Sequence, residues 1–204
     1  MRLKGSCIQE QINKNHDLCK TAEDFMNSIE IEGESKKAML FSAFLKISLS
    51  HFYAINILVN LELYASAFAL VRVFFDSVVR GLYTAYIFDE ITVDKIWADE
   101  ANWKFPNSTK MSKALDSCFN FNEKIFEQSI GNVYNIMCDY IHTGYNQVAY
   151  QFDNQNLTIQ SDFNVEQVKD TLKANHFYMN FFIEKYKDFI FQYNKQQYTG
   201  ETKK

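Results

Sequence analysis

The sequence predicts an all-α fold, a single-domain helical bundle of about five to seven helices. Of its 204 residues, 47% are hydrophobic and 16% are aromatic, which is enough apolar material for a packed core. The chain contains one proline and six glycines, whereas a β-sandwich or barrel of this length needs many turns built from those residues. Apolar side chains recur instead at the spacing of one helix face.

We expect one helical domain over residues 1–204, with an N-terminal helix at 6–29, a main bundle at 36–196 and a frayed tail at 197–204. Within the bundle we expect six helices. The first spans 36–61, the second runs from a turn at 62–64 to near Phe88, and a short third helix follows Thr92. The fourth spans 110–119, the fifth spans 123–143, and the last begins at a capping-box-like pair, Asn164 and Gln167, and runs to near Gln196.

Three local signals mark where these helices begin and where the chain turns. Ser35 is the expected N-cap of the helix at 36–61. Pro106, the only proline, predicts an ordered loop at 103–109. The polar stretch 150–163 is expected to form a loop with a small hairpin.

Charge and cysteine usage restrict the classes of function. The net charge is -4 and there is no basic block, which argues against extended binding to DNA. The four cysteines show no C-x-x-C pairing and suggest free thiols in a reducing cytoplasm. The longest uncharged run, 47–61, falls short of a membrane span, so membrane association is not expected even though 40–88 is very apolar.

A charged stripe is the most informative feature of the chain. Arg72, Asp76 and Arg80 recur every four residues, so they line one edge of a single helix. The stripe is either a solvated edge, an Arg–Asp–Arg ladder that holds helices in register, or an anion site. In the third case two arginines share one carboxylate, which leaves positive charge for a group such as phosphate.

A second candidate lies at the expected end of the 123–143 helix. His142 follows Asp139 by three residues, and a histidine beside a carboxylate can transfer protons near neutral pH. The alternative is a histidine that interacts with the helix dipole and the last carbonyls.

Other chemistries have no support in the sequence. No set of ligands has the spacing of a zinc site and there is no phosphate loop, so no metal or cofactor is expected. We interpret His51 as a core histidine with a hydrogen-bonded partner, and His16 and His176 as surface residues.

Residues 45–150 resemble an uncharacterised family of bacterial helical proteins. The resemblance rests on the order and spacing of Ser66-Ala67, Leu70-Val71-Arg72, Asp76, Arg80, Trp97-Ala98, the Pro106 loop, Tyr140-Ile141-His142-Thr143-Gly144 and Gln147.

That layout is in turn similar to the HEPN superfamily, the higher-eukaryote and prokaryote nucleotide-binding domain. Many HEPN proteins are dimeric, metal-independent ribonucleases of bacterial defence and toxin–antitoxin systems, with an arginine four to six residues from a histidine. The resemblance implies such an activity, but 135–137 hold Asn135, Ile136 and Met137, so the arginine is missing beside His142. Arg72 or Arg80 would have to replace it.

Two hypotheses therefore remain. In the first, the protein is a HEPN-like ribonuclease or effector of antiphage defence, with Arg72, Arg80, Asp139 and His142 as catalytic residues. In the second, it is a non-catalytic binding or scaffold protein. A homodimer or higher homo-oligomer is expected in both, as is RNA or a small anionic ligand. The remaining binding residues are Asp76, Ser66, Thr143 and Gln147.

Overall fold

The computed structural model describes residues 6–31, 35–98, 104–130, 152–153, 158–159 and 163–199. Seven helices lie within these ranges, together with one hairpin of two short strands. The prediction of an all-α helical bundle is confirmed.

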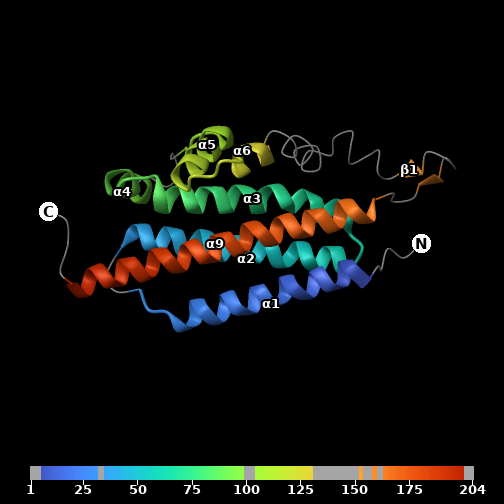
Figure 1. Ribbon diagram of the computed structural model, residues 1–204, viewed down its shortest axis with the longest axis horizontal. Coiled ribbons are helices and arrows are strands. Elements are labelled where there is room, and N and C mark those ends of the chain that lie inside the picture. Colours follow the sequence, from blue (N-terminus) through green and yellow to red (C-terminus); the bar gives the residue numbers. More distant parts are fainter. Residues whose placement is uncertain are drawn as a thin grey trace.

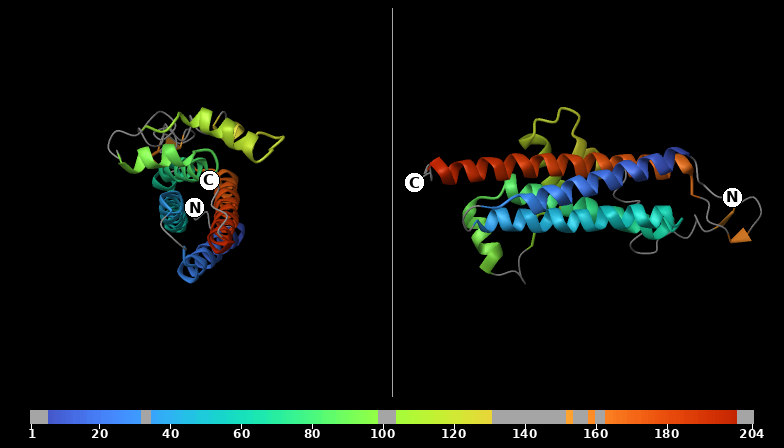
Figure 2. Two further views of the ribbon diagram at one scale, coloured as in Figure 1. Left: turned by 90° about the vertical axis from the view of Figure 1, so that its left-hand side faces the viewer. Right: turned by 90° about the horizontal axis from the view of Figure 1, so that it is seen from below.

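Four long helices form the body of the bundle, and α2 is central to it. The helix α2 packs along α3 and also contacts α1 and α9. Figure 2 shows these helices end on, with α3, α1 and α9 on three sides of α2. The four helices are α1 (Ser6–Ser28), α2 (Lys36–Asn60), α3 (Tyr64–Tyr86) and α9 (Val165–Thr199).

Three shorter helices follow α3, namely α4 (Glu90–Ala98), α5 (Ser108–Cys118) and α6 (Ile125–Ser129). The helices α5 and α6 lie over the outer side of α3, and α4 lies at one end of the bundle, where it contacts α2 (Figure 1). The prediction of a small hairpin in the polar stretch is also confirmed, because β1 (Phe152–Asp153) pairs antiparallel with β2 (Thr158–Ile159). Of the helix predicted at 123–143, the part after Ile130 lies outside the described residues.

The predicted first residues of α2 and α9 agree with the structure, and in both helices a polar side chain caps the first turn. The Ser35 hydroxyl accepts a hydrogen bond from the backbone N–H of Ala38 at 3.1 Å, and Asn164 accepts one from the N–H of Glu166 at 2.8 Å. Both side chains satisfy an N–H that has no partner inside the helix.

Two short helices begin earlier than predicted, and caps explain both differences. Asn107 accepts a hydrogen bond from the N–H of Lys110 at 2.9 Å, so α5 begins at Ser108 and the Pro106 loop is shorter than 103–109. Asp89 accepts one from the N–H of Thr92 at 2.8 Å, so α4 begins at Glu90 and Thr92 lies within it.

Aromatic side chains hold α2, α3 and α9 together. Phe41 of α2 is fully buried, and its ring stacks on that of Phe182 with centroids 5.3 Å apart. It also meets the rings of Tyr86, Tyr186 and Phe189 edge-on. These contacts combine a large buried apolar area with the ring geometry that aromatic pairs prefer.

A buried polar network joins α1, α2 and α9 at one level of the bundle. The Asn15 amide donates to the side-chain oxygen of Asn56 at 2.8 Å, and the Asn15 side-chain oxygen accepts from Gln11 at 3.0 Å. That oxygen also lies 2.9 Å from Nδ1 of His176. The interpretation of His176 as a surface residue is therefore wrong, because its ring is half-buried and hydrogen-bonded across two helices.

The pKa of His176 makes this network sensitive to acid. Burial first, and then the charge of Lys14, lower the pKa of His176 below its usual 6.5. The folded protein therefore favours the neutral ring, while the unfolded chain binds a proton as the pH falls through 6.5. We expect the free energy of unfolding to decrease as the pH drops below about 6.5. Urea titrations between pH 7.5 and 5 measure this slope.

One variant isolates the contribution of His176. His176→Gln should flatten the pH dependence, because it removes the ring whose pKa burial lowers. Equal slopes in the variant and the unsubstituted protein would contradict the assignment. His51 contributes in the same direction, because burial lowers its pKa too. No described residue hydrogen-bonds its ring, so its predicted partner is not found there.

Candidate functional site

The charged stripe of α3 lies at the packing boundary between α3 and α5. Arg72 and Asp76 are partly buried, with side chains 23% and 18% exposed, and Nε of Arg72 lies 3.7 Å from a carboxylate oxygen of Asp76. The hydroxyl of Ser108, the first residue of α5, donates to the other oxygen of Asp76 at 3.2 Å. Arg72, Asp76 and Ser108 each make interactions beyond these two. We call Arg72, Asp76, Arg80 and Ser108 the α3–α5 seam.

Arg80 does not share the carboxylate of Asp76. Its guanidinium lies over the ring of Phe105, 5.4 Å from the centroid, and its side chain is exposed. Phe105 is itself held edge-on by Phe44 at 5.8 Å and tilted against Phe88 at 5.7 Å. Among the described residues Arg80 makes no ion pair, so the Arg–Asp–Arg ladder reduces there to a single Arg72–Asp76 pair.

The packing of α3 explains why the stripe is at this edge. Val71, Phe75 and Val79 directly precede the three stripe residues and are buried towards the other helices, so Arg72, Asp76 and Arg80 fall together on the neighbouring side of α3. The helix α5 covers part of that side, because Met111 and Leu115 are fully or almost fully buried there. An ion pair in this position is shielded from water more than a pair on an open surface.

Sequence reasoning missed the contributions of Phe105, Ser108 and Ser112. Ser112 is one helical turn after Ser108 and is fully buried, and its hydroxyl has no hydrogen-bond partner among the described residues. A buried hydroxyl without a partner costs free energy, so Ser112 has hydrogen-bonding capacity that the described part of the protein does not use. The signal available in the sequence was Asn107-Ser108 directly after Pro106, which marks a helix start.

The remaining predicted site residues are not brought to the seam by the described structure. Ser66 is exposed near the start of α3, more than two turns before Asp76. Asp139, His142, Thr143 and Gln147 lie outside the described residues.

The chain nevertheless reaches the middle of α3 just before the segment that carries His142. The ring of Phe126 in α6 lies 6.4 Å from that of Phe75, the neighbour of Asp76. The backbone N–H groups of Phe126 and Glu127 donate to the buried carboxylate of Asp116 at 2.9 and 2.8 Å, which fixes α6 to the end of α5. Ile130 directly follows α6, and residues 131–151, which include His142, lie outside the described residues.

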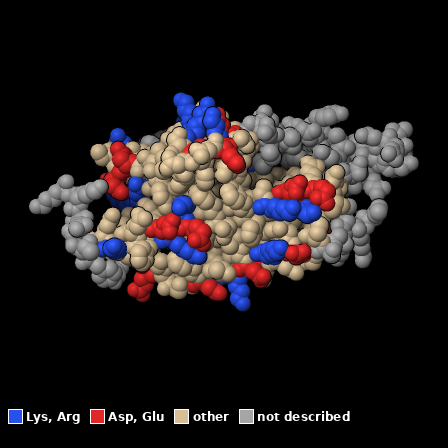
Figure 3. Space-filling model, viewed as in Figure 1, with Lys and Arg blue, Asp and Glu red and all other residues tan. Residues whose placement is uncertain are grey.

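The surface charge is mixed rather than segregated. Figure 3 shows acidic and basic side chains interspersed over the visible face, with basic groups projecting above the α5 region. The lysines of α5 are Lys110 and Lys113, both exposed. These two lysines thus place positive charge on the helix that packs against the stripe of α3.

Other reactive groups are not assembled into a site. The described residues contain no group of three or more His, Cys, Asp or Glu side chains that could hold a metal ion. Cys7, Cys19 and Cys118 are free thiols, and burial raises the pKa of Cys19 to about 12, so it remains a protonated apolar group.

These features define the class of the protein as an all-α helical bundle with a partly buried arginine–aspartate pair on one helix edge. The chain belongs to DUF6988, a family of unknown function, whose model matches residues 45–182. The expected membership of an uncharacterised family is therefore confirmed. Comparison with curated proteins and with solved structures gives no match.

Proposed function

We propose that the protein binds a phosphate group of RNA at the α3–α5 seam, with Arg80 as the principal contact. The observation that carries this proposal is the position of Arg80, an exposed guanidinium that lies on an aromatic ring and makes no ion pair with a described carboxylate. A guanidinium held in this way presents its remaining N–H donors in a plane that matches two phosphate oxygens.

The other residues of the α3–α5 seam hold the structure around Arg80 in position. Asp76 fixes Arg72 and Ser108, so the pair anchors α5 and the preceding Phe105 loop beside α3. The ring of Phe105 offers a face on which a base can also stack, a contact that tolerates any sequence. Single-stranded RNA exposes both phosphates and bases, whereas a duplex requires a broader positive surface than a chain of net charge -4 provides.

A second candidate is metal-independent cleavage of the bound RNA, as the HEPN resemblance implies. It is favoured by the contact between the rings of Phe126 in α6 and Phe75, the neighbour of Asp76 on α3, because Asp139 and His142 follow α6 in the sequence. In this reaction the ribose 2′-oxygen attacks the adjacent phosphorus and the bond to the 5′-oxygen breaks. His142 would accept the proton of the 2′-hydroxyl, and Arg80 would neutralise the phosphate. We place such an effector in the bacterial cytoplasm, in antiphage defence.

Binding of a fluorescent single-stranded RNA at several salt concentrations tests the first proposal. We expect Arg80→Ala to weaken RNA binding about tenfold. The slope of the logarithm of the binding constant against the logarithm of the salt concentration should become shallower by about one. Arg80→Lys should recover part of the affinity, because it keeps the charge and loses the planar donors.

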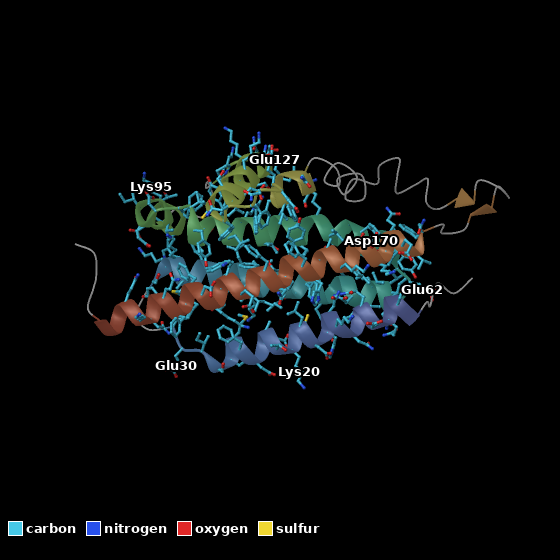
Figure 4. All side chains as sticks on the ribbon, viewed as in Figure 1. Lys20, Glu30, Glu62, Lys95, Glu127 and Asp170 are labelled. Atoms are coloured by element: carbon cyan, nitrogen blue, oxygen red, sulfur yellow. The ribbon has the colours of Figure 1, made fainter. Side chains whose placement is uncertain are left out.

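Lys20→Ala is the matched control, since Lys20 is an exposed cation on α1, on the far side from α5 (Figure 4). Equal effects of Arg80→Ala and Lys20→Ala would show that the loss is only one of net charge, and would contradict a site at the seam. The same RNA, incubated in excess chelator, separates the two candidates. If the protein cleaves the RNA and His142→Ala abolishes cleavage but not binding, the ribonuclease proposal is supported. If the protein binds the RNA without cleaving it, the proposal of a non-catalytic binding protein is supported.

A further inference from the structure

The outward side of α2 is an apolar surface that no described helix covers. Figure 2 shows α3, α1 and α9 on the other sides of α2. Large apolar side chains on this side are about half exposed, for example Met39 at 49% and Leu61 at 59%. We call the set the α2 face, and its members, spaced three or four residues apart, are Met39, Ala43, Ile47, Ser50, Tyr53, Ile57 and Leu61.

The composition of α2 shows how unusual this exposure is. Among the described residues α2 is the single helix long and apolar enough to cross a membrane, yet only 39% of its most apolar window is buried. Between Lys37 and Glu62 its one charged residue is Lys46. A contiguous apolar surface of this kind typically marks an interaction site.

We infer that the α2 face binds the α2 face of a second copy of this chain, with the two helices antiparallel and the two-fold axis near Ser50. A two-fold interface requires a surface that is complementary to itself. Residues equally far from Ser50 along the chain then meet, and the side chains of each such pair are apolar or aromatic. Met39 meets Leu61, Ile47 meets Tyr53, and the small Ala43 accommodates the larger Ile57.

The small residues at the centre permit close contact between the helices. Ser50 lies at the proposed axis and Ala54 is one helical turn from it, so the two backbones can approach there while larger side chains interlock on either side. Helix α2 has 25 residues and is thus about 37 Å long. A helix face of that length, with its flanks, approaches the roughly 800 Å² per partner that a stable interface buries.

A groove beside the face adds area for the partner. It has a volume of about 390 Å³, lies between α1 and α2, and is lined in part by Met26, Leu49 and Tyr53. Tyr53 belongs both to the groove and to the face, so side chains of a second copy that pass Tyr53 can enter the groove. The groove therefore widens the contact beyond one helix.

Charges at the two ends of the face are of opposite sign. Lys36 lies at the start of α2, where it also pairs with Asp94 at 2.7 Å. Glu62, labelled in Figure 4, lies at the turn into α3. Antiparallel helices bring each Lys36 towards the Glu62 end of the other copy, whereas parallel helices would bring like charges together. Lys46 is exposed beside the middle of the face and can keep its charge in water at the edge of a contact between two helices. Insertion of the face into lipid would instead bring that charge towards hydrocarbon, where it is costly.

Sedimentation velocity of the full chain over a range of concentrations tests the inference. We expect a dimer that Ile57→Asp weakens at least tenfold, because the two-fold axis places the new charge twice in the apolar contact. The control is Ile91→Asp on α4, since Ile91 is more exposed than Ile57, at 65% against 42%, and lies off the face. Circular dichroism should show that both variants keep the helical fold.

Cross-linking locates the axis. Ser50→Cys should be joined efficiently to its own counterpart by a short bismaleimide, and the unsubstituted chain reports the background from its four native cysteines. A monomeric parent chain, a dimer that is lost in Ile91→Asp rather than in Ile57→Asp, or no cross-link at Ser50→Cys would each overturn the inference. Sedimentation of the monomer with anionic vesicles, abolished by Ile57→Asp, would assign the face to a membrane instead.

Discussion

Phe41→Ala is expected to lower the free energy of unfolding by about 4 kcal/mol, the largest effect of any single truncation considered for this protein. Phe41 is fully buried in α2, and its ring contacts four aromatic rings, one on α3 and three on α9. Truncation removes these contacts and leaves a cavity that such rigid neighbours cannot fill. Urea denaturation monitored by circular dichroism at constant protein concentration gives the value.

Two further variants keep this prediction testable if Phe41→Ala does not fold. Phe41→Leu conserves most of the volume and should cost about 1.5 kcal/mol. Phe191→Ala is the matched control, because Phe191 is 72% exposed on α9, and its truncation should cost less than about 0.5 kcal/mol. Similar losses for Phe41→Ala and Phe191→Ala would show that the Phe41 ring is not the centre of this packing.

Gly81→Ala is expected to destabilise the protein by about 3 kcal/mol, although the same change in an exposed helix stabilises by about 1 kcal/mol. A Cβ atom on Gly81 would lie 2.8 Å from Cβ of Phe44 and would overlap the tip of the Phe182 ring. The Phe182 ring, which belongs to α9, is stacked against Phe41 of α2, so it has little room to move away from Gly81.

The double variant Gly81→Ala with Phe182→Leu separates a steric clash from other causes. If the clash is the cause, the double variant should be more stable than the sum of the two single losses predicts. Ser66→Ala, on the exposed side of the same helix, should change stability by less than about 0.5 kcal/mol. Strictly additive losses would contradict the steric explanation.

Gly81 also connects the core to the candidate site. It precedes the last turn of α3 and follows Arg80 directly, and Phe44, which its Cβ would strike, holds Phe105 beneath the Arg80 guanidinium. Displacement of Phe44 should therefore reach Arg80 through a single intervening ring. The RNA affinity of folded Gly81→Ala, compared with that of Ser66→Ala, reports whether the position of Arg80 depends on this packing.

The sequence by itself determined the fold class and most helix boundaries. The scarcity of Gly and Pro and the helical spacing of apolar residues are properties of local structure, as are the caps at Ser35 and Asn164, so they can be recognised without tertiary information. The alignment of Arg72, Asp76 and Arg80 on one edge followed from the helix period in the same way.

Only the tertiary structure decided how those residues are used. Spacing placed Arg72 and Arg80 at equal distance from Asp76, but the Phe105 loop gave Arg80 an aromatic partner, and the start of α5 gave Asp76 the Ser108 hydroxyl. The burial of His176 and the crowding at Gly81 likewise arise from helices far apart in the chain. Periodicity specifies which side chains share a face of one helix, whereas contacts between helices depend on packing that local sequence does not encode.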